Sequence, residues 1–187
     1  MLRLLRYSRN WAHRMRECHF SVAISCFQSG LLLAAAKHPI RTGTNIPLPS
    51  MSTQPPLPAG AEEISTAGFN LYVGPIYRLP DVRAGADGHF CFPVAEKHMN
   101  SAGSVHGGML MSFADVAMSQ TARFGTDFTA SHTVSLNCDF VGPGRAGDLV
   151  EAHVRVTRRT RTIVFLSCDV VSGDRTLLVA SGVWKIA

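Results

Sequence analysis

Paired cysteines and metal-ligand motifs are missing from this chain. Its five cysteines are odd in number and widely spaced, and none belongs to a CxxC or Cys/His motif. The pattern excludes a disulfide framework and a zinc-finger type of structural metal, so we expect a reducing compartment and no metal or redox cofactor. Two of the thiols, those of Cys138 and Cys168, lie in apolar alternating runs, where cysteine acts as a small hydrophobic residue rather than a nucleophile.

Acidic residues are nearly absent from the first 50 positions, which hold seven Lys or Arg and a single acid, Glu17. Residues 51–187 hold 11 basic and 12 acidic residues, so their formal charge is −1 although the whole chain carries +5. The larger part of the chain is therefore near neutral. This balance argues against a nucleic-acid-binding surface, and we expect no nucleic acid partner.

Long apolar runs are also missing. The run 21–36 is interrupted by Gln28 and Ser29 and is too short for a convincing membrane span, so we expect no membrane partner. Residues 1–50 can be interpreted as a secretory signal, as an Arg-rich mitochondrial presequence, or as a basic extension upstream of a start at Met51. We favour the extension, because the basic region is long for a signal, and we expect a cytoplasmic protein; a genuine presequence would make it mitochondrial.

A folded domain is expected over residues 61–187, after a Pro-rich linker over 51–60. Residues 61–74 suggest a short amphipathic helix, and 89–94 a strand. The run 107–124 predicts a helix that ends at Gly125, and its apolar residues on nearly every side indicate that it is buried.

Four β-type runs follow the predicted helix, at 131–141, 148–158, 161–171 and 176–186. In the first, Val134, Leu136, Cys138 and Phe140 alternate with Thr133, Ser135, Asn137 and Asp139, which is the period of a half-buried strand. The connections are short, which favours an antiparallel meander. We therefore predict an α+β domain in which an antiparallel sheet wraps one long buried helix.

The start of the predicted helix is a candidate anion or oxyanion site. His106-Gly107-Gly108 puts two residues without side chains where the first N–H groups of a helix lack partners and point outward. The alternative is that the glycines only let the helix end pack closely and that His106 is a capping residue.

Asp115 is a second candidate, because aspartate is a poor residue for the interior of an apolar helix. With Gly108, Ser112 and Ser119 it forms one narrow polar stripe at helical spacing. The stripe either faces water or presents a carboxylate that a reaction uses, and the residues alone leave both interpretations open.

The segment HMNSAGSVHGGMLMSFADVAMS resembles the signature of the hotdog-fold acyl-CoA thioesterases of the phenylacetate-degradation (PaaI) type. That pattern is Asn, six residues to His-Gly-Gly, and nine residues from the His to an acidic residue on the helix. Five residues fill it without gaps: Asn100, His106, Gly107, Gly108 and Asp115. The resemblance covers roughly residues 65–186 and implies the hotdog fold.

The resemblance also implies roles for these residues. The Gly107 N–H would polarise the thioester carbonyl, and Asp115 would activate water or attack directly. Asn100 and His106 would position the carbonyl or the water. A hydroxyl would orient the water; it aligns on Thr133, or on Ser135 if the register is shifted.

The sequence also offers candidate substrate-binding residues. Gly108 and Ser112 lie on the polar stripe, and four arginines at predicted turns are candidates for the phosphates of CoA, with solvated turn residues as the alternative for each: Arg145, Arg158, Arg159 and Arg161. The acyl group stays open between phenylacetyl-type and medium-chain esters. Two other functions stay open as well, a hotdog enoyl-CoA hydratase or dehydratase and a non-catalytic acyl-CoA-binding protein.

An active site built from two subunits is expected as well. Gly107 and Asp115 are eight residues apart, which is roughly 12 Å along one helix, too far for both to act on one carbonyl. Two antiparallel helices related by a twofold axis would bring them together. We therefore predict a homodimer, or a tetramer made of two dimers, with active sites at the subunit interface.

Overall fold

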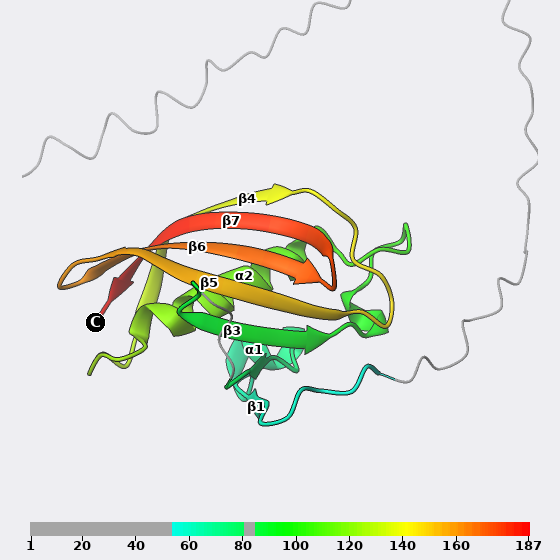
Figure 1. Ribbon diagram of the computed structural model, residues 1–187, viewed down its shortest axis with the longest axis horizontal. Helices are drawn as coiled ribbons and strands as arrows, with labels where there is room; N and C mark the ends of the chain where they lie inside the picture. Colours follow the sequence, from blue (N-terminus) through cyan, green and yellow to red (C-terminus); the bar gives the residue numbers. More distant parts are fainter. Residues whose placement is uncertain (1–53, 81–84) are drawn as a thin grey trace, which may run out of the picture. The chain divides into compact units, whose positions relative to one another are not determined.

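A computed structural model describes residues 54–80 and 85–187 (Figure 1), all of which belong to one unit of the chain, Pro47–Ala187. The predicted extension over residues 1–50 and the first residues of the predicted linker 51–60 lie outside the described residues. The interpretations offered for that stretch therefore stay predictions.

The apolar run after His106 forms the long helix α2, Gly107–Arg123. Nine of its 17 residues are buried, as the all-round apolar pattern predicts. The chain leaves the helix at Phe124 and turns at Gly125, whose φ of +69° lies in the left-handed region that favours glycine. Among the described residues no helix is long and apolar enough to span a bilayer.

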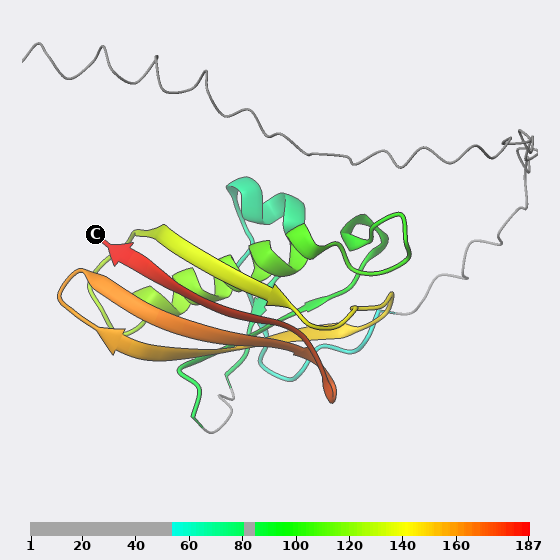
Figure 2. The ribbon, with the colours of Figure 1, turned by 90° about the horizontal axis from the view of Figure 1, so that it is seen from above.

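One antiparallel sheet wraps this helix. Its five long strands are β3 (Gly88–Pro93), β4 (Ser131–Phe140), β5 (Leu149–Arg159), β6 (Ile163–Ser172) and β7 (Arg175–Ile186). Two short strands, β1 (Glu62–Glu63) and β2 (Tyr77–Arg78), extend one edge, and the order is β1-β2-β3-β5-β6-β7-β4. A short helix α1 (Gly68–Val73) lies on the same side of the sheet as α2 (Figure 2), and one 3-10 turn, Glu96–His98, precedes α2. The predicted α+β class and hotdog architecture are confirmed.

The core lies between α2 and the concave face of the sheet. Alternate residues of β3, β5, β6 and β7 point toward the helix, and the Phe92 and Phe113 rings meet edge to face with centroids 4.7 Å apart. Trp184 of β7 is fully buried in the same layer. Each large side chain buried in this way contributes about 1.5–3 kcal/mol, so the packing fixes α2 firmly against the sheet.

The prediction of a simple meander is wrong at one step. Strands β4 and β5 are consecutive in the chain but not neighbours: β4 pairs with β7, whereas β5 pairs with β3 and β6. The connection 141–148 is long enough to pass the end of the sheet, and it begins on β7, where the Val141 and Gly142 N–H groups both donate to the Leu177 carbonyl. As a result β4 lies at the sheet edge (Figure 1).

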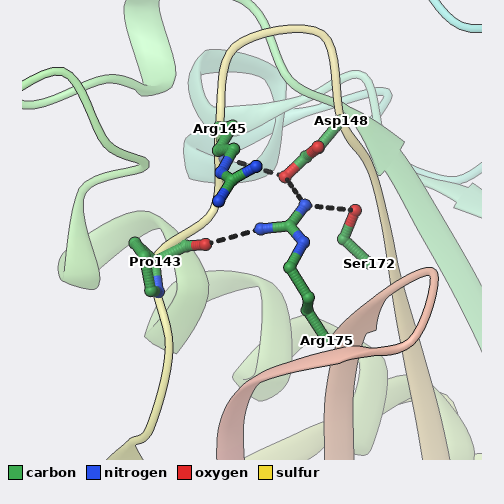
Figure 3. Close-up of polar contacts among 5 residues, drawn as sticks. All are labelled: Pro143, Arg145, Asp148, Ser172 and Arg175. Atoms are coloured by element: carbon green, nitrogen blue, oxygen red, sulfur yellow. Dashed lines mark hydrogen bonds and ion pairs between the residues drawn. The ribbon is translucent and has the colours of Figure 1, made fainter.

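A single arginine holds this crossing connection in place (Figure 3). The Arg175 guanidinium donates to the Pro143 carbonyl at 2.8 Å and to the Asp148 carboxylate at 2.7 Å, and it also reaches Ser172 at 3.3 Å. Asp148 in turn accepts from the Arg145 backbone N–H at 2.8 Å. The network ties the two ends of the connection to the turn between β6 and β7.

Candidate active site

Asp115, in the middle of α2, contacts the edge strand β4. The carboxylate is half-buried, and its Oδ1 accepts a hydrogen bond of 2.6 Å from the Thr133 hydroxyl. Hydrogen bonds to an ionised group are shorter and stronger than neutral ones, so Thr133 fixes the orientation of the carboxylate. The structure thus brings together two residues that the sequence paired only through a resemblance.

A β-bulge in β4 makes this contact possible. Thr133 pairs with Trp184, a buried residue on the helix side of β7, but Ser135 pairs with Val183 on the outer side, and the register shifts between Thr133 and Ser135. Without the extra residue, Val134, strict alternation would place Thr133 on the side opposite Leu136. The bulge instead aims Thr133 at α2, a known use of bulges beside functional sites.

Gly182, on β7 beside the bulge, is required for this geometry. A Cβ there would lie 2.4 Å from the Ser135 carbonyl oxygen and 2.7 Å from the Trp184 ring. Neither the backbone of β4 nor the buried indole can move aside easily. Glycine at position 182 therefore permits the close approach that turns the Thr133 hydroxyl inward.

The predicted polar stripe of α2 runs along β4. Ser119 meets Ser131 with 2.6 Å between the hydroxyl oxygens, one turn beyond the Asp115–Thr133 contact. Ser112, one turn before Asp115, borders two pockets. The stripe is therefore a contact surface between helix and edge strand that also opens to pockets.

The N-terminus of α2 is capped by His106. Its ring Nδ1 accepts from the Gly108 N–H at 2.9 Å, and its carbonyl accepts from the Met109 N–H at 2.8 Å. A Cβ on Gly108 would lie 2.9 Å from that Nδ1, so glycine makes room for the cap. Among the described residues, the Gly107 N–H has no acceptor and sits at the positive end of the helix dipole.

Phe140, near the end of β4, borders this helix start. A Cβ on Gly107 would lie 3.2 Å from the Phe140 ring, so the ring leaves little room for a side chain. Because Thr133 contacts Asp115 and Phe140 contacts Gly107, β4 runs the length of α2 from the carboxylate to the free N–H group.

Asn100 organises the loop before α2. Its Oδ1 accepts from the Ala102 N–H at 2.9 Å and the Ser104 N–H at 3.1 Å, and its Nδ2 donates to the Ser104 hydroxyl. The His106 N–H donates to the His98 carbonyl at 2.8 Å, which joins this loop to the 3-10 turn. The roles of Asn100 and His106 toward a substrate stay predictions, because both side chains also have these local structural contacts.

Two adjoining pockets lie between α1 and α2. The larger, about 350 Å³, is bordered by His98, His106 and Gly108 from the approach to α2 and by Tyr72 from α1. The smaller, about 280 Å³, has Asp115 in its wall together with Met111, Val116 and Leu136. Phe69 and Ser112 border both pockets, which therefore adjoin and are together called the recess; its smaller part reaches the carboxylate.

The described cysteines are not nucleophiles of this site. Burial raises the pKa of the Cys138 thiol, and the carboxylates of Asp139 and Asp115 raise it further. Burial and Glu151 raise the pKa of Cys91 to about 12, and burial raises that of Cys168 as well. Since the thiolate is the reactive form, these shifts disfavour a nucleophilic role for the three thiols near neutral pH.

Comparison with known proteins identifies the family of this chain. The family model described as "Thioesterase superfamily" matches residues 102–179. The chain is 37% identical over 94 residues to PA0474 of Pseudomonas aeruginosa, a protein named provisionally as an esterase, covering 50% of this chain and 70% of that one. The chain belongs to the thioesterase superfamily. It is therefore a thioester hydrolase by family.

Similarity to two other known proteins is lower. Acyl-coenzyme A thioesterase 13 of mouse is 27% identical over 90 residues, which are 48% of this chain and 64% of that protein. The solved structure of the Escherichia coli PaaI protein, from the phenylacetic acid degradation operon, superimposes with a TM-score of 0.50 at 24% identity, covering 54% of this chain and 72% of that one. This structural likeness supports the hotdog fold.

The four candidate arginines fall at opposite ends of α2. The exposed Arg145 lies near the Gly107 end, because the carbonyl of its neighbour Gly144 accepts from the Val105 N–H at 2.9 Å. The guanidinium of Arg159 donates to the carbonyls of Ala122 at 2.6 Å and Thr121 at 3.4 Å, and so caps the other end of α2. Arg158 and Arg161 are exposed beside it.

The sequence interpretation missed the walls of the recess and one positioning residue. Phe69 and Tyr72 of α1 are 64% and 77% exposed, so the opening helix presents its rings to the recess instead of the core. Met111 is 44% exposed and borders the smaller pocket, although the apolar pattern suggested core. Gly182 carried no signal beyond being a glycine in a strand, which often marks a bulge or close approach.

Proposed function

We propose that this protein hydrolyses acyl-CoA thioesters to the free acid and CoA, with Asp115 as its catalytic carboxylate. The observation that carries the proposal is the Asp115–Thr133 hydrogen bond of 2.6 Å in the wall of an apolar recess. A carboxylate beside an apolar space can act on a bound acyl thioester, either as a base or as a nucleophile. The name of the mouse relative, acyl-coenzyme A thioesterase 13, supports CoA as the leaving group.

Asp115 has two ways to act. Because Thr133 holds Oδ1, the second oxygen, Oδ2, can accept a proton from a water molecule that attacks the carbonyl carbon. Alternatively, Oδ2 attacks the carbon itself and water then hydrolyses the anhydride. In both routes the C–S bond breaks, CoA leaves as the thiol, and the acyl group leaves as the acid.

The Gly107 N–H supplies the complementary role. As the negative charge develops on the thioester oxygen, a free N–H at a helix N-terminus stabilises that oxyanion. The His106 cap holds the first turn in place, and the absence of a side chain at position 107 lets the substrate oxygen approach. Loss of one such donor typically costs about 3 kcal/mol of transition-state stabilisation.

The active site is composite in this proposal. Gly107 and Asp115 are both on α2 and roughly 12 Å apart along its axis, so a single helix cannot place both at one carbonyl. Seven of the ten residues of the edge strand β4 are exposed, among them Val134 at 63% and Phe140 at 55%, and edge strands of this kind tend to pair with another chain. A twofold homodimer, alone or in a tetramer, would bring Gly107 of one subunit to Asp115 of the other.

The recess and Arg145 suggest how the substrate lies. The apolar lining near Asp115 suits an acyl group of phenylacetyl or medium-chain type, with Ser112 and Gly108 along its edge. Arg145, near the Gly107 end and exposed, is our first candidate for the CoA phosphates. Arg159 is the weakest of the four because its guanidinium already caps α2.

Thiol release from a panel of acyl-CoA esters tests the activity, with hydration of an enoyl-CoA measured in parallel. Thiol release from phenylacetyl or medium-chain esters is expected. Hydration without thiol release would favour a hydratase, and tight binding of acyl-CoA with no turnover would favour a binding protein.

Complementation tests the composite site. A subunit carrying Asp115→Asn is refolded together with one carrying Gly107→Pro, each inactive alone. Random pairing makes half of the dimers mixed, and each mixed dimer has one intact site, so about a quarter of wild-type activity should return. No recovery in a sample that contains mixed dimers would rule out the composite site.

We also propose a cytoplasmic location, on the basis of the unpaired cysteines and the interpretation of residues 1–50 as an extension. Fractionation of cells that express the full chain tests this, and recovery in mitochondria would contradict it.

A further inference from the structure

Three side chains with metal-binding atoms meet on the face of the sheet that points away from α2. His89 belongs to β3, and Glu151 and His153 belong to β5. His89 is paired with His153 in the strand register, and residues 151 and 153 share a face because side chains alternate along a strand. The intervening Phe90 and Ala152 point into the core, so the three lie on the opposite side of the sheet from Asp115.

Their ligand atoms are close together. The His89 Nε2 lies 2.8 Å from the Glu151 Oε2, and the His153 Nε2 lies 3.8 Å from the same oxygen. One ligand atom from each of the three residues lies within 4.8 Å of the other two. The two imidazole rings face each other with centroids 4.4 Å apart. Both rings therefore present the same nitrogen to one carboxylate oxygen.

The spacing of the three side chains can be compared with that of zinc ligands. The 2.8 Å contact of His89 is a normal hydrogen bond, but 3.8 Å from His153 to the same oxygen is too long for one. A zinc ion binds His nitrogen and carboxylate oxygen at roughly 2.0–2.2 Å, which separates neighbouring tetrahedral ligands by roughly 3.3 Å. The two nitrogen-to-oxygen separations, 2.8 and 3.8 Å, lie on either side of that value.

We propose that His89, Glu151 and His153 form a binding site for a divalent transition metal, with Zn²⁺ as the expected ion. Two imidazoles and one carboxylate are a common set of three protein ligands for zinc, and imidazole suits zinc better than it suits Mg²⁺ or Ca²⁺. Water completes the shell, because the Glu151 side chain is 29% exposed while the histidines are 12% and 8% exposed.

The neighbours on the same face fit this ligand set. Asp169 pairs with His153 across the β5–β6 register, but its carboxylate is ion-paired with Arg155. Cys91 pairs with Glu151, and its side chain is fully buried. Glu151 is therefore the carboxylate available to the ion.

A bound metal ion would link β3 to β5 and stabilise the folded chain. Two ligands on β5 and one on β3 bridge the two strands on the outer face, opposite the packed core. A ligand that binds the folded chain better than the unfolded one raises stability. Zinc should therefore raise the unfolding temperature while hydrolysis, which takes place on the other face of the sheet, changes little.

Zinc binding by the full chain tests the proposal. The protein is freed of metal with a chelator, and Zn²⁺ alone is then titrated in competition with a chromophoric chelator. His89→Gln and Glu151→Gln should each bind one Zn²⁺ fewer than the wild type, or bind it at least 100-fold more weakly. The matched control is His132→Gln, an exposed histidine of β4, which should bind as the wild type does.

The unfolding temperature and the histidine NMR signals give two further tests of the zinc site. Far-UV circular dichroism shows whether each variant is folded, and the unfolding temperature should rise with Zn²⁺ in the wild type and control but not in the two variants. Without any substitution, Zn²⁺ should shift the ring NMR signals of His89 and His153 and leave that of His132 in place. Equal Zn²⁺ binding by wild type and both folded variants, or unmoved His89 and His153 signals at saturating Zn²⁺, would overturn the proposal.

Discussion

Replacing Thr133 by valine removes one hydroxyl and leaves the shape of the side chain almost unchanged. The hydroxyl donates to Asp115 Oδ1 at 2.6 Å, at the bulge where β4 meets α2. In Thr133→Val the carboxylate keeps its place on the helix but loses the bond that orients it. We expect the unfolding temperature to change little, because Thr133 is exposed in the single chain.

The size of the effect follows from the kind of bond that is lost. A hydrogen bond to a charged group contributes about 1.5–3 kcal/mol, and each 1.36 kcal/mol at the transition state changes the rate tenfold. If most of this free energy acts at the transition state, loss of the hydrogen bond lowers kcat by roughly 10-fold to 100-fold. KM should stay within about twofold, because Thr133 does not border the recess.

Thiol release from an acyl-CoA at saturating substrate measures this. Thr133→Ser keeps the hydroxyl and should retain most of the activity, and Asn137→Ala, an exposed change on the same strand, is the control for general damage to β4. The reasoning fails if Thr133→Val retains kcat within twofold of wild type. It also fails if Ser135→Ala loses the activity that Thr133→Val keeps, since the register would then be wrong.

Three other predictions concern the frame around the site. Gly182→Ala places a Cβ 2.4 Å from the Ser135 carbonyl oxygen, so it should lower the free energy of unfolding by roughly 1–3 kcal/mol and also reduce kcat. Denaturant titration measures the first effect and thiol release the second. A stable, fully active variant would contradict the role given to the bulge. Burial and Lys97 lower the pKa of His98, so below about pH 6.5 the unfolded chain binds a proton at this residue more readily than the folded chain does. The unfolding temperature should therefore fall as the pH drops below this value. His98→Gln should flatten that decline, and an equal decline in the variant would exclude His98 as its source. A shortened chain that begins at Met51 should fold and hydrolyse like the full chain, as measured by circular dichroism and thiol release, and loss of folding would show that residues 1–50 belong to the domain.

Patterns within single elements predicted most of the fold, but the helix expected over 61–74 was wrong in its first half, where strand β1 lies and α1 begins only at Gly68. The all-round apolar run before Gly125 predicted a buried helix, and α2 ends within one residue of the expected position. The strands lie within two residues of the predicted runs, because alternation and turn residues are local properties that tertiary packing seldom overrides at this length.

Pairing of distant strands was harder to predict. Nothing in the connection 141–148 shows that it crosses to a different neighbour, and the partner that holds it, Arg175, is 27 residues beyond Asp148. A bulge is similarly hidden: an alternating run looks regular, yet one extra residue at Val134 turns Thr133 to the other face. The resemblance therefore made Asp115 and Thr133 candidates, but the sequence could not explain how they meet.

At the ends of α2 and on the outer face of the sheet, the sequence also could not show which side chains meet. Arg158, Arg159 and Arg161 look equivalent in the sequence, yet the structure uses Arg159 as a helix cap. The absence of ligand spacing such as CxxC suggested no metal site. His89 and His153 come together only through strand pairing across more than 60 residues, a kind of cluster that spacing cannot reveal.

The catalytic role of Asp115 is tested most directly by thiol release from an acyl-CoA with wild type and Asp115→Asn side by side. The asparagine keeps the shape and can still accept a hydrogen bond from Thr133, but it can neither take a proton from water nor attack the carbonyl. We expect kcat to fall by roughly 10²-fold to 10⁴-fold with KM little changed, because binding does not depend on the charge of the base. Turnover by Asp115→Asn within a few-fold of wild type would contradict the account.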